Sequence, residues 1–340
     1  MKGQSLSDTA QALFADDKGL LAIDESIHTC NRRFAALGIS QTEEARRAYR
    51  ELLITAPGLD DAISGVILCD ETIRQKTSDG TPMITALLAA GITPGIKVDT
   101  GEIAMSGHPH EHITEGLDGL KARLDEYALL GARFSKWRAV IEIGEGLPTR
   151  ACVEANAHGL ARFAAVSQEA GLVPIVEPEV LIEGSHSLDR CRDVTELVLH
   201  EVFHQLFTQG VALDAMILKP GMVVPGLSCP QQHTVNEVAE ATVKCLLRSV
   251  PAAVPAVAFL SGGQACELAT ARLTAMNVIF KATRPWALAF SFARAIQQPA
   301  LELWRGEERN IVAAQQALVH RARCNWSARR GDYNSAMEQR

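Results

Sequence analysis

Eight short apolar runs, separated by longer segments with helical periodicity, constrain the fold of this chain more than any other feature. The runs cover residues 20–24, 65–69, 95–99, 134–140, 173–178, 215–220, 256–262 and 287–292. Segments such as TEEARRAYRELLITA and VNEVAEATVKCLLRSV, which lie between them, repeat apolar residues with the period of a helix. Alternating strands and helices indicate parallel βα units, and eight such units can close into a barrel. We therefore predict a single (β/α)8 TIM barrel over residues 1–324, followed by a polar, mobile C-terminal tail over 325–340.

An open doubly wound sheet is the alternative fold for the same alternation. The length of 340 residues leaves one or two domains open, and the 47 % hydrophobic content is sufficient for a large core in either case. However, no G-x-G-x-x-G motif follows the first strand, so nothing supports a dinucleotide crevice. The barrel is the better prediction.

The charge and the segment types exclude several classes of partner. The net charge is −7, so the chain has no global basic field for binding nucleic acid or an anionic membrane surface. No apolar run has the length of a signal peptide core or of a membrane helix, and we expect a soluble, cytoplasmic protein. The eight cysteines form no C-x-x-C pair, which predicts free thiols and neither a disulfide framework nor a thiolate metal site.

Nearly every apolar run ends in charged or small polar residues. In a parallel barrel these ends converge at the mouth, where active sites lie, and residues two apart on a strand point to the same side. The candidate residues at the ends of the runs are Asp24, Lys97, Lys136, Arg138, Glu177, Glu179, Lys219, Ser261, Gly262, Gly263, Ser291 and Arg294. The many cations in an acidic chain predict a mouth built for an anionic substrate.

Lys219 follows an apolar strand and directly precedes a proline. A lysine that is desolvated beside other cations loses its proton more easily, and the neutral amine can attack a carbonyl at neutral pH. Lys136 is a candidate second cation, and Glu177, on the strand between them, is placed to act as the general acid and base that a carbinolamine needs. A purely structural pairing of Lys219 with Glu177 remains the alternative.

Two loops have the composition of phosphate sites. The SGG sequence at 261–263 presents glycine amides after the seventh strand, and Arg294 follows the eighth, which are the two loops where barrels frequently bind phosphate. The basic NRR segment at 31–33, after the first strand, forms a second cationic cluster. We expect one phosphate at each place.

Several motifs together resemble class I fructose-1,6-bisphosphate aldolase. These are LAIDES, GVILCDETI, GIKVDTG, SKWR, VPIVEPE, LKPGM, FLSGGQ and RPWALAFSFARA, in order over residues 5–325. The resemblance implies a (β/α)8 barrel, usually a homotetramer, that works without metal or other cofactor through a lysine Schiff base. It also implies reversible cleavage of fructose 1,6-bisphosphate into dihydroxyacetone phosphate and glyceraldehyde 3-phosphate, in glycolysis and gluconeogenesis, with sugar phosphates as the small-molecule partners.

The resemblance also implies roles by position. Lys219 would form the Schiff base, Glu177 would shuttle protons for it, Asp24 and Lys136 would handle the C4 hydroxyl, and Glu179 and Lys97 would support the charge network. The residues implied to bind the C1 phosphate are Ser261, Gly262, Ala293 (through its amide) and Arg294; those implied near the C6 phosphate are Ser26, Arg32 and Arg33. Gly263, Ser291 and Arg138 complete the expected polar site.

Four positions depart from the family pattern. Gly221 stands where asparagine is common after LKP, Ala293 replaces a glycine in the phosphate loop, and His28 replaces a glycine near the C6-phosphate cluster. The chain ends in MEQR without a terminal tyrosine, and its last tyrosine is Tyr333. These changes concern the turnover rate and the choice between one and two phosphates.

Three further motifs point to other functions. HEVFH at 200–204 formally matches a zinc-protease motif, but its histidines fall opposite the apolar stripe of the predicted helix. HPHEH at 108–112 lies in a Gly, Ser and Pro loop that we expect to be mobile, and RGD at 330–332 is interpreted as a chance tripeptide. A zinc hydrolase and a non-catalytic barrel are the competing hypotheses to an imine-forming aldolase.

Overall fold

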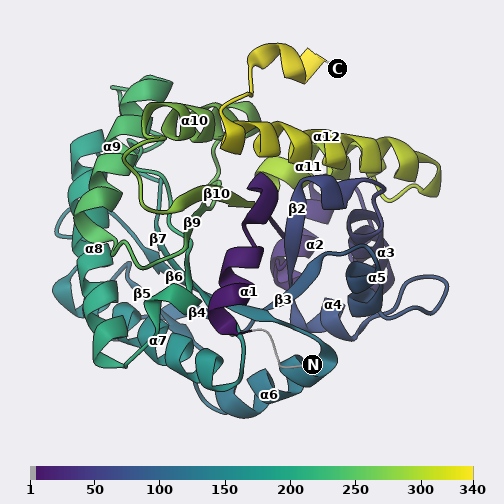
Figure 1. The fold of residues 1–340 in the computed structure, drawn as a ribbon, viewed down its shortest axis with the longest axis horizontal. Coiled ribbons are helices and arrows are strands. Elements are labelled where there is room, and N and C mark those ends of the chain that lie inside the picture. Colours follow the sequence, from purple (N-terminus) through teal and green to yellow (C-terminus); the bar gives the residue numbers. More distant parts are fainter. Residues whose placement is uncertain (1–4, 340) are drawn as a thin grey trace.

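The computed structural model describes residues 5–339, and its centre is a closed barrel of eight parallel strands (Figure 1). The strands are β1 (Gly19–Ala22), β2 (Ile63–Leu68), β3 (Thr93–Lys97), β6 (Phe134–Ile141), β7 (Val173–Val180), β8 (Ile217–Leu218), β9 (Ala256–Phe259) and β10 (Ala287–Phe292). Each predicted apolar run overlaps one of them, and β1 pairs with both β2 and β10. The (β/α)8 prediction is confirmed, and the open sheet is wrong because the last strand closes on the first.

Helices surround the barrel as an outer ring, except the first, which lies across one end (Figure 1). They are α1 (Leu6–Ala12), α2 (Ile27–Ala35), α3 (Glu43–Ile54), α4 (Asp70–Arg74), α5 (Met83–Ala89), α6 (Leu120–Leu130), α7 (Arg150–Glu169), α8 (Leu188–Thr208), α9 (Val235–Ser249), α10 (Cys266–Ile279), α11 (Arg294–Trp304) and α12 (Ile311–Arg330). Ser and Thr side chains cap several of them; Thr234 and Glu237, for example, form a reciprocal capping box at the start of α9. Across residues 5–339, none of these helices combines the length and the apolar character needed to cross a bilayer.

Large and small residues alternate inside the barrel. The ring of Phe134 lies where Gly95 has no side chain, since a Cβ on Gly95 would fall 2.1 Å from it, and Gly65 makes room on the next strand. Ile67, Ile175 and other apolar residues complete this inner cluster. The interior is therefore a packed core below the mouth and not a pore.

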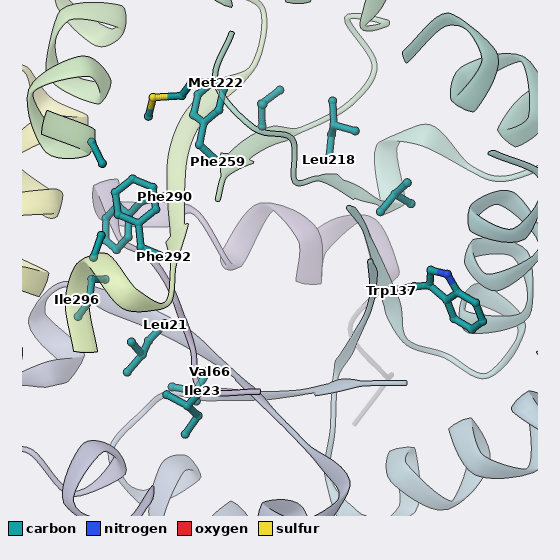
Figure 2. Packing of buried hydrophobic residues seen from close by; sticks show 14 of the residues in the cluster. Leu21, Ile23, Val66, Trp137, Leu218, Met222, Phe259, Phe290, Phe292 and Ile296 are labelled. Carbon is teal, nitrogen blue, oxygen red and sulfur yellow. The ribbon is translucent and has the colours of Figure 1, made fainter. Parts of the chain in front are cut away.

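The opposite faces of the strands pack against the helices. Figure 2 shows this outer layer, in which Leu21, Ile23 and Val66 lie beside helices on one side of the barrel and Trp137 lies beside helices on the other. Trp137 on β6 stacks on Phe163 of α7 with ring centroids 5.6 Å apart. Burial on both faces explains why the strands read as continuous apolar runs in the sequence.

The amino-terminal segment closes one end of the barrel. Figure 1 shows α1 lying across the barrel axis, and Ala10, Leu13 and Phe14 belong to the inner apolar cluster. Arg329 of α12 donates a 3.1 Å hydrogen bond to the carbonyl of Phe14 and so links the two ends of the chain. Substrate access is thus restricted to the opposite end, the mouth.

Two parts of the fold differ from the sequence prediction. The segment around HPHEH is the turn of an antiparallel hairpin formed by β4 (Gly101–Ala104) and β5 (His112–Glu115), because cross-strand pairing orders a stretch rich in Gly and Pro. The predicted tail begins too early: α12 continues to Arg330, and Asn325 is fully buried and accepts a 2.8 Å hydrogen bond from Thr270. A tertiary partner therefore keeps this polar segment helical, and residues 1–4 and 340 of the predicted ranges lie outside the described residues.

Candidate active site

Five charged side chains from five strands meet at the mouth of the barrel. Lys97 ends β3, Asp24 and Lys219 follow β1 and β8, and Lys136 and Glu177 lie within β6 and β7. The side chains of Lys136, Glu177 and Lys219 are only 4–5 % exposed, and that of Asp24 is 9 % exposed. The closed barrel brings together residues that are up to 195 positions apart in the chain, so the convergence predicted from the strand ends is present for this set.

These groups form a chain of alternating charge. Lys219 Nζ lies 3.1 Å from Glu177 Oε1, and Glu177 Oε2 lies 2.6 Å from Lys136 Nζ. Lys136 Nζ in turn donates a 3.0 Å hydrogen bond to Asp24 Oδ2. Glu177 therefore contacts both lysines at once, and a proton that moves along the chain needs no solvent.

Burial and neighbouring charges change the protonation of this cluster. Burial lowers the pKa of Lys219 from its ordinary value of 10.5, although Asp24 and Glu179 oppose the change. Burial also lowers the pKa of Lys136, to about 8, against the effect of Asp24. Burial raises the pKa of Asp24, but Lys136 and Lys219 together outweigh it and hold that pKa at about 2. The site thus favours an ionised aspartate beside lysines that lose their protons readily.

Two further ion pairs lie beside this cluster of charged groups. Lys97 Nζ contacts Asp99 Oδ1 at 2.5 Å, and Arg138 Nε contacts Glu179 Oε2 at 2.5 Å. Asp99 was not among the predicted site residues; the hydrogen bond of 3.3 Å that its Oδ2 accepts from the amide of Arg138 depends on the fold. Glu102 on the unpredicted hairpin lies 3.7 Å from Arg138 and extends this network toward solvent.

The loops after β9 and β10 form a small basic cradle. Gly262 and Gly263 have φ angles of 55° and 89°, a backbone conformation that favours glycine. A Cβ on Gly263 would lie 3.3 Å from Arg294 Nη2, so the guanidinium of Arg294, the first residue of α11, lies directly beside this loop. Ser261 is buried next to them, and the hydroxyl of buried Ser291 has no hydrogen-bond partner within residues 5–339. Exposed amides, a helix start and one cation suit a phosphate group.

The predicted cluster after β1 divides into two parts. Ser26 caps α2, and Arg32 is exposed and takes part in no ion pair among residues 5–339. Arg33 instead lies 2.5 Å from Glu25 and donates hydrogen bonds to the side chains of Gln297 (3.0 Å) and Gln298 (3.2 Å). Only Ser26 and Arg32 are therefore open to an incoming group.

Sequence reasoning missed the residues that hold Arg33. Glu25 also binds the buried Arg50 at 2.8 Å, and Gln297 accepts a 3.0 Å hydrogen bond from Tyr49 and donates one to the carbonyl of Ala22. No local pattern indicates these pairs because they join β1, α3 and α11. Glu25 lies within the LAIDES motif, but its partners Arg33 and Arg50 can be identified only from the fold.

The departures from the family pattern have different surroundings in the structure. A Cβ on Gly221 would lie 3.6 Å from the carbonyl oxygen of Val180 and 4.0 Å from Leu260, which is ordinary contact. Ala293 is the N-cap of α11, and His28 is exposed on α2. Tyr333 lies after α12 and donates a 2.8 Å hydrogen bond to Glu338, so its hydroxyl is engaged there.

The competing motifs do not assemble sites. His200 and His204 are exposed on α8 while Val202 and Phe203 are buried, which confirms the predicted solvent face of HEVFH. His108 contacts Glu111 at 3.4 Å in the hairpin turn, but HPHEH brings no three potential ligands together in the described part of the chain. All eight cysteines are free, as predicted.

Comparison with known proteins identifies the family. The sequence profile described as fructose-bisphosphate aldolase class-I matches residues 5–340. A probable fructose-bisphosphate aldolase class 1 of Xanthomonas axonopodis pv. citri is 53 % identical over 334 residues, which is 98 % of this chain and 99 % of that protein. The cytosolic fructose-bisphosphate aldolase 6 of Arabidopsis thaliana is 49 % identical over 316 residues, covering 93 % of this chain and 88 % of that protein.

A solved structure agrees with the sequence comparison. The fructose-bisphosphate aldolase of Plasmodium falciparum superposes with a TM-score of 0.95 at 44 % identity, over 97 % of this chain and 95 % of that one. The matched segments include every strand of the barrel and the mouth that the charged cluster occupies. The chain therefore belongs to the class I fructose-bisphosphate aldolase family, whose members cleave fructose 1,6-bisphosphate reversibly through a Schiff base.

Proposed function

We propose that Lys219 forms the Schiff base with the C2 carbonyl of fructose 1,6-bisphosphate. The observation that carries this assignment is the contact of 3.1 Å between its buried Nζ and a carboxylate oxygen of Glu177. Burial lowers the pKa of Lys219, so the neutral amine is available for attack at a lower pH than on an exposed lysine. Lys136 shares the same carboxylate, but it is committed to Asp24 as well.

Glu177 serves in this proposal as the acid and base of imine formation. Addition of the amine to the carbonyl gives a carbinolamine, whose hydroxyl must leave as water before the C=N bond forms. Glu177 donates the proton to that hydroxyl and recovers one when water adds back during hydrolysis. Its second oxygen, 2.6 Å from Lys136, links the proton to the rest of the cluster.

Asp24 and Lys136 act on the C4 hydroxyl. When the C3–C4 bond breaks, the C4 oxygen loses its proton and becomes the aldehyde of glyceraldehyde 3-phosphate, and the electron pair of the bond moves into the protonated imine. Asp24, which is ionised at neutral pH, takes up the proton of the C4 hydroxyl, while Lys136 holds Asp24 in place at 3.0 Å. Glu179 and Lys97 balance the charge around them through Arg138 and Asp99.

The two assigned phosphate places follow neighbouring strands of the barrel, because β1 pairs with β10. We assign the C1 phosphate to the cradle after β9 and β10, which consists of Ser261, Gly262, Gly263, Ser291, the amide of Ala293 and the guanidinium of Arg294. For the C6 phosphate we assign Ser26 and the exposed Arg32; Arg33 supports the loop through Glu25. Arg138, on β6, is assigned to the polar lining of the mouth.

The wider properties of the chain follow the family in this proposal. Class I aldolases work without a metal, and we propose that catalysis at Lys219 needs none. We propose a homotetramer, supported by large apolar side chains on the surface such as Leu129 (89 % exposed) and Phe207 (82 % exposed). A cytoplasmic location is proposed from relatives named cytosolic, although one relative is named chloroplastic.

Borohydride trapping tests the assignment. The protein is reduced in the presence of dihydroxyacetone phosphate with EDTA throughout, and the adduct is located by peptide mass mapping. We expect one irreversible adduct, on Lys219, and none without the sugar phosphate. An adduct on Lys97 or Lys136, or no adduct, would contradict the proposal.

A further inference from the structure

The last helix and the C-terminal turn bring together three potential metal ligands, none of which has a role assigned above. His320 and Cys324 lie one turn apart on α12, and Glu338 lies in the short 3-10 helix Ser335–Gln339. One ligand atom from each of the three lies within 4.8 Å of the other two. Within residues 5–339, this is the one group of three His, Cys, Asp or Glu side chains whose ligand atoms lie this close together.

The distances agree with those around a tetrahedral ion. His320 Nε2 lies 3.7 Å from Cys324 Sγ and 3.8 Å from Glu338 Oε2. Tetrahedral zinc, with bonds of about 2.0 Å to nitrogen or oxygen and about 2.3 Å to sulfur, holds its ligands roughly 3.3 to 3.6 Å apart. These two separations exceed that range by a few tenths of an ångström, and all three ligand atoms lie within 4.8 Å of one another, so small side-chain rotations would bring them onto one ion.

The carboxylate is already oriented for this role. Its Oε1 receives hydrogen bonds from Arg321 and from the hydroxyl of Tyr333 (2.8 Å), which leaves Oε2 directed toward His320. Arg321 is buried and is itself fixed by a 2.7 Å hydrogen bond to Thr270 of α10. Such outer partners fix the orientation of a ligating carboxylate in known metal sites.

We propose that His320, Cys324 and Glu338 form a binding site for Zn²⁺ that fastens the C-terminal segment to α12. Sulfur and imidazole ligands favour zinc over the hard cations magnesium and calcium, and water fills the fourth position. His320 also lines a surface hollow of about 480 Å³ between α12 and the residues before β2, so an aqueous ion can reach His320 from this side, while Cys324 is buried. The ion displaces the thiol proton of Cys324 to solvent as the sulfur binds.

The role of this site is structural and does not involve the cleavage reaction. α12 and the turn after it contribute none of the charged groups at the barrel mouth, which come from β1, β3, β6, β7 and β8. Without an ion, the polar partners of the Cys324 thiol are His320 and Glu338, and the C-terminal turn is held by Arg321 and Tyr333. With the ion, this turn gains a bond to the helix that salt does not screen.

Cobalt and zinc titrations of the full chain test the proposal. After EDTA treatment and dialysis, one equivalent of Co²⁺ should give a thiolate charge-transfer band that Zn²⁺ then abolishes. His320→Gln changes a side chain that is 31 % exposed, so folding is retained, and it should weaken zinc binding at least about 100-fold. Cys324→Ser should remove the band, while the matched variants Cys245→Ser, at another buried helical cysteine, and His200→Gln should keep it.

Hydrogen exchange gives the second readout. Zinc should slow amide exchange in residues 335–339 of the wild type and leave it unchanged in His320→Gln. A band or a zinc affinity that survives both His320→Gln and Cys324→Ser would overturn the proposal, as would the absence of stoichiometric binding. Aldolase activity should persist in every variant, so these outcomes are separate from those at Lys219.

Discussion

The carboxylate of Glu177 lies 3.1 Å from the amine of Lys219, on the neighbouring strand of the barrel. The backbone fixes this contact, because the amide of Lys219 donates a 2.8 Å hydrogen bond to the carbonyl of Val176. This backbone hydrogen bond between β7 and the residue after β8 thus places the two side chains beside each other before any substrate is present. A general acid at hydrogen-bond distance from a buried amine is the minimum that carbinolamine dehydration requires.

Replacing that carboxylate tests whether it moves protons. Glu177→Gln keeps the size of the side chain but removes its ability to donate and recover a proton, so we expect kcat to fall by about 10²- to 10⁴-fold. Formation of the borohydride-trapped adduct should slow in parallel, as measured by single-turnover trapping. Glu145→Gln, at an exposed loop position, is the control. A variant that traps at the wild-type rate would leave Glu177 a purely structural partner.

The lowered pKa of Lys219 predicts a specific pH profile. The attacking amine must be neutral, so trapping accelerates with rising pH and becomes constant above the pKa of the lysine. Because burial lowers that pKa, the midpoint of the profile should lie below the ordinary value of 10.5. The measurement is the rate of adduct formation against pH, with circular dichroism confirming that the fold is intact. A midpoint at or above 10.5 would contradict the effect of burial.

Asp24 makes the stability of the protein depend on pH at the acid end. Its folded-state pKa of about 2 lies below the ordinary 3.8, so its ionised form stabilises the folded state above pH 3.8, and this contribution is lost as the pH falls toward 2. The contribution amounts to about 2 kcal/mol, and roughly half of it is lost by pH 3. Urea unfolding of the wild type and of Asp24→Asn at several pH values measures it: the difference in free energy of unfolding should narrow below pH 4. A difference that is constant from pH 6 to pH 3 would refute the assignment.

Substitutions of Arg294 and Arg309 distinguish direct phosphate binding from a general effect of positive charge. Arg294→Gln removes the guanidinium beside Gly263, and a charge-assisted contact of this kind contributes about 1.5 to 3 kcal/mol, so kcat/KM should fall roughly 10- to 150-fold. Arg309→Gln removes an equal charge from a side chain that is 80 % exposed and should change little. Steady-state kinetics with fructose 1,6-bisphosphate decide the matter. Equal effects of the two variants would point to long-range charge alone.

The sequence predicted the fold and the centre of the site because their signals are local. Strands buried on both faces read as apolar runs, and the polar residues within or just after them, such as Lys136 and Lys219, mark the mouth. The assignment of residues such as Ser261 and Arg32 to the two phosphates stays a prediction.

What the sequence did not indicate depends on partners distant in the chain. Arg33 resembled a phosphate ligand, yet the fold pairs it with Glu25 and Gln297, and the latter is 264 positions away. Asn325 read as part of a polar tail because its partner Thr270 lies on another helix. The hairpin at β4 and β5 was missed since Gly and Pro in its turn suggested a mobile loop. None of these contacts has a periodic or compositional signal.

Substitutions of Arg32 and Arg33 test the division of the basic cluster after β1 into an exposed arginine and an ion-paired one. Arg33 lies 2.5 Å from Glu25 in a nearly buried pair, so Arg33→Gln leaves a carboxylate partly unpaired and should lower the free energy of unfolding by about 1 to 3 kcal/mol. Arg32 is exposed, so Arg32→Gln should leave stability within about 0.5 kcal/mol of the wild type and raise KM for the bisphosphate. Urea denaturation and steady-state kinetics on both variants measure the two effects. If Arg33→Gln raised KM without any loss of stability, its side chain would have to leave Glu25 to meet the substrate, and the division of the cluster would be wrong.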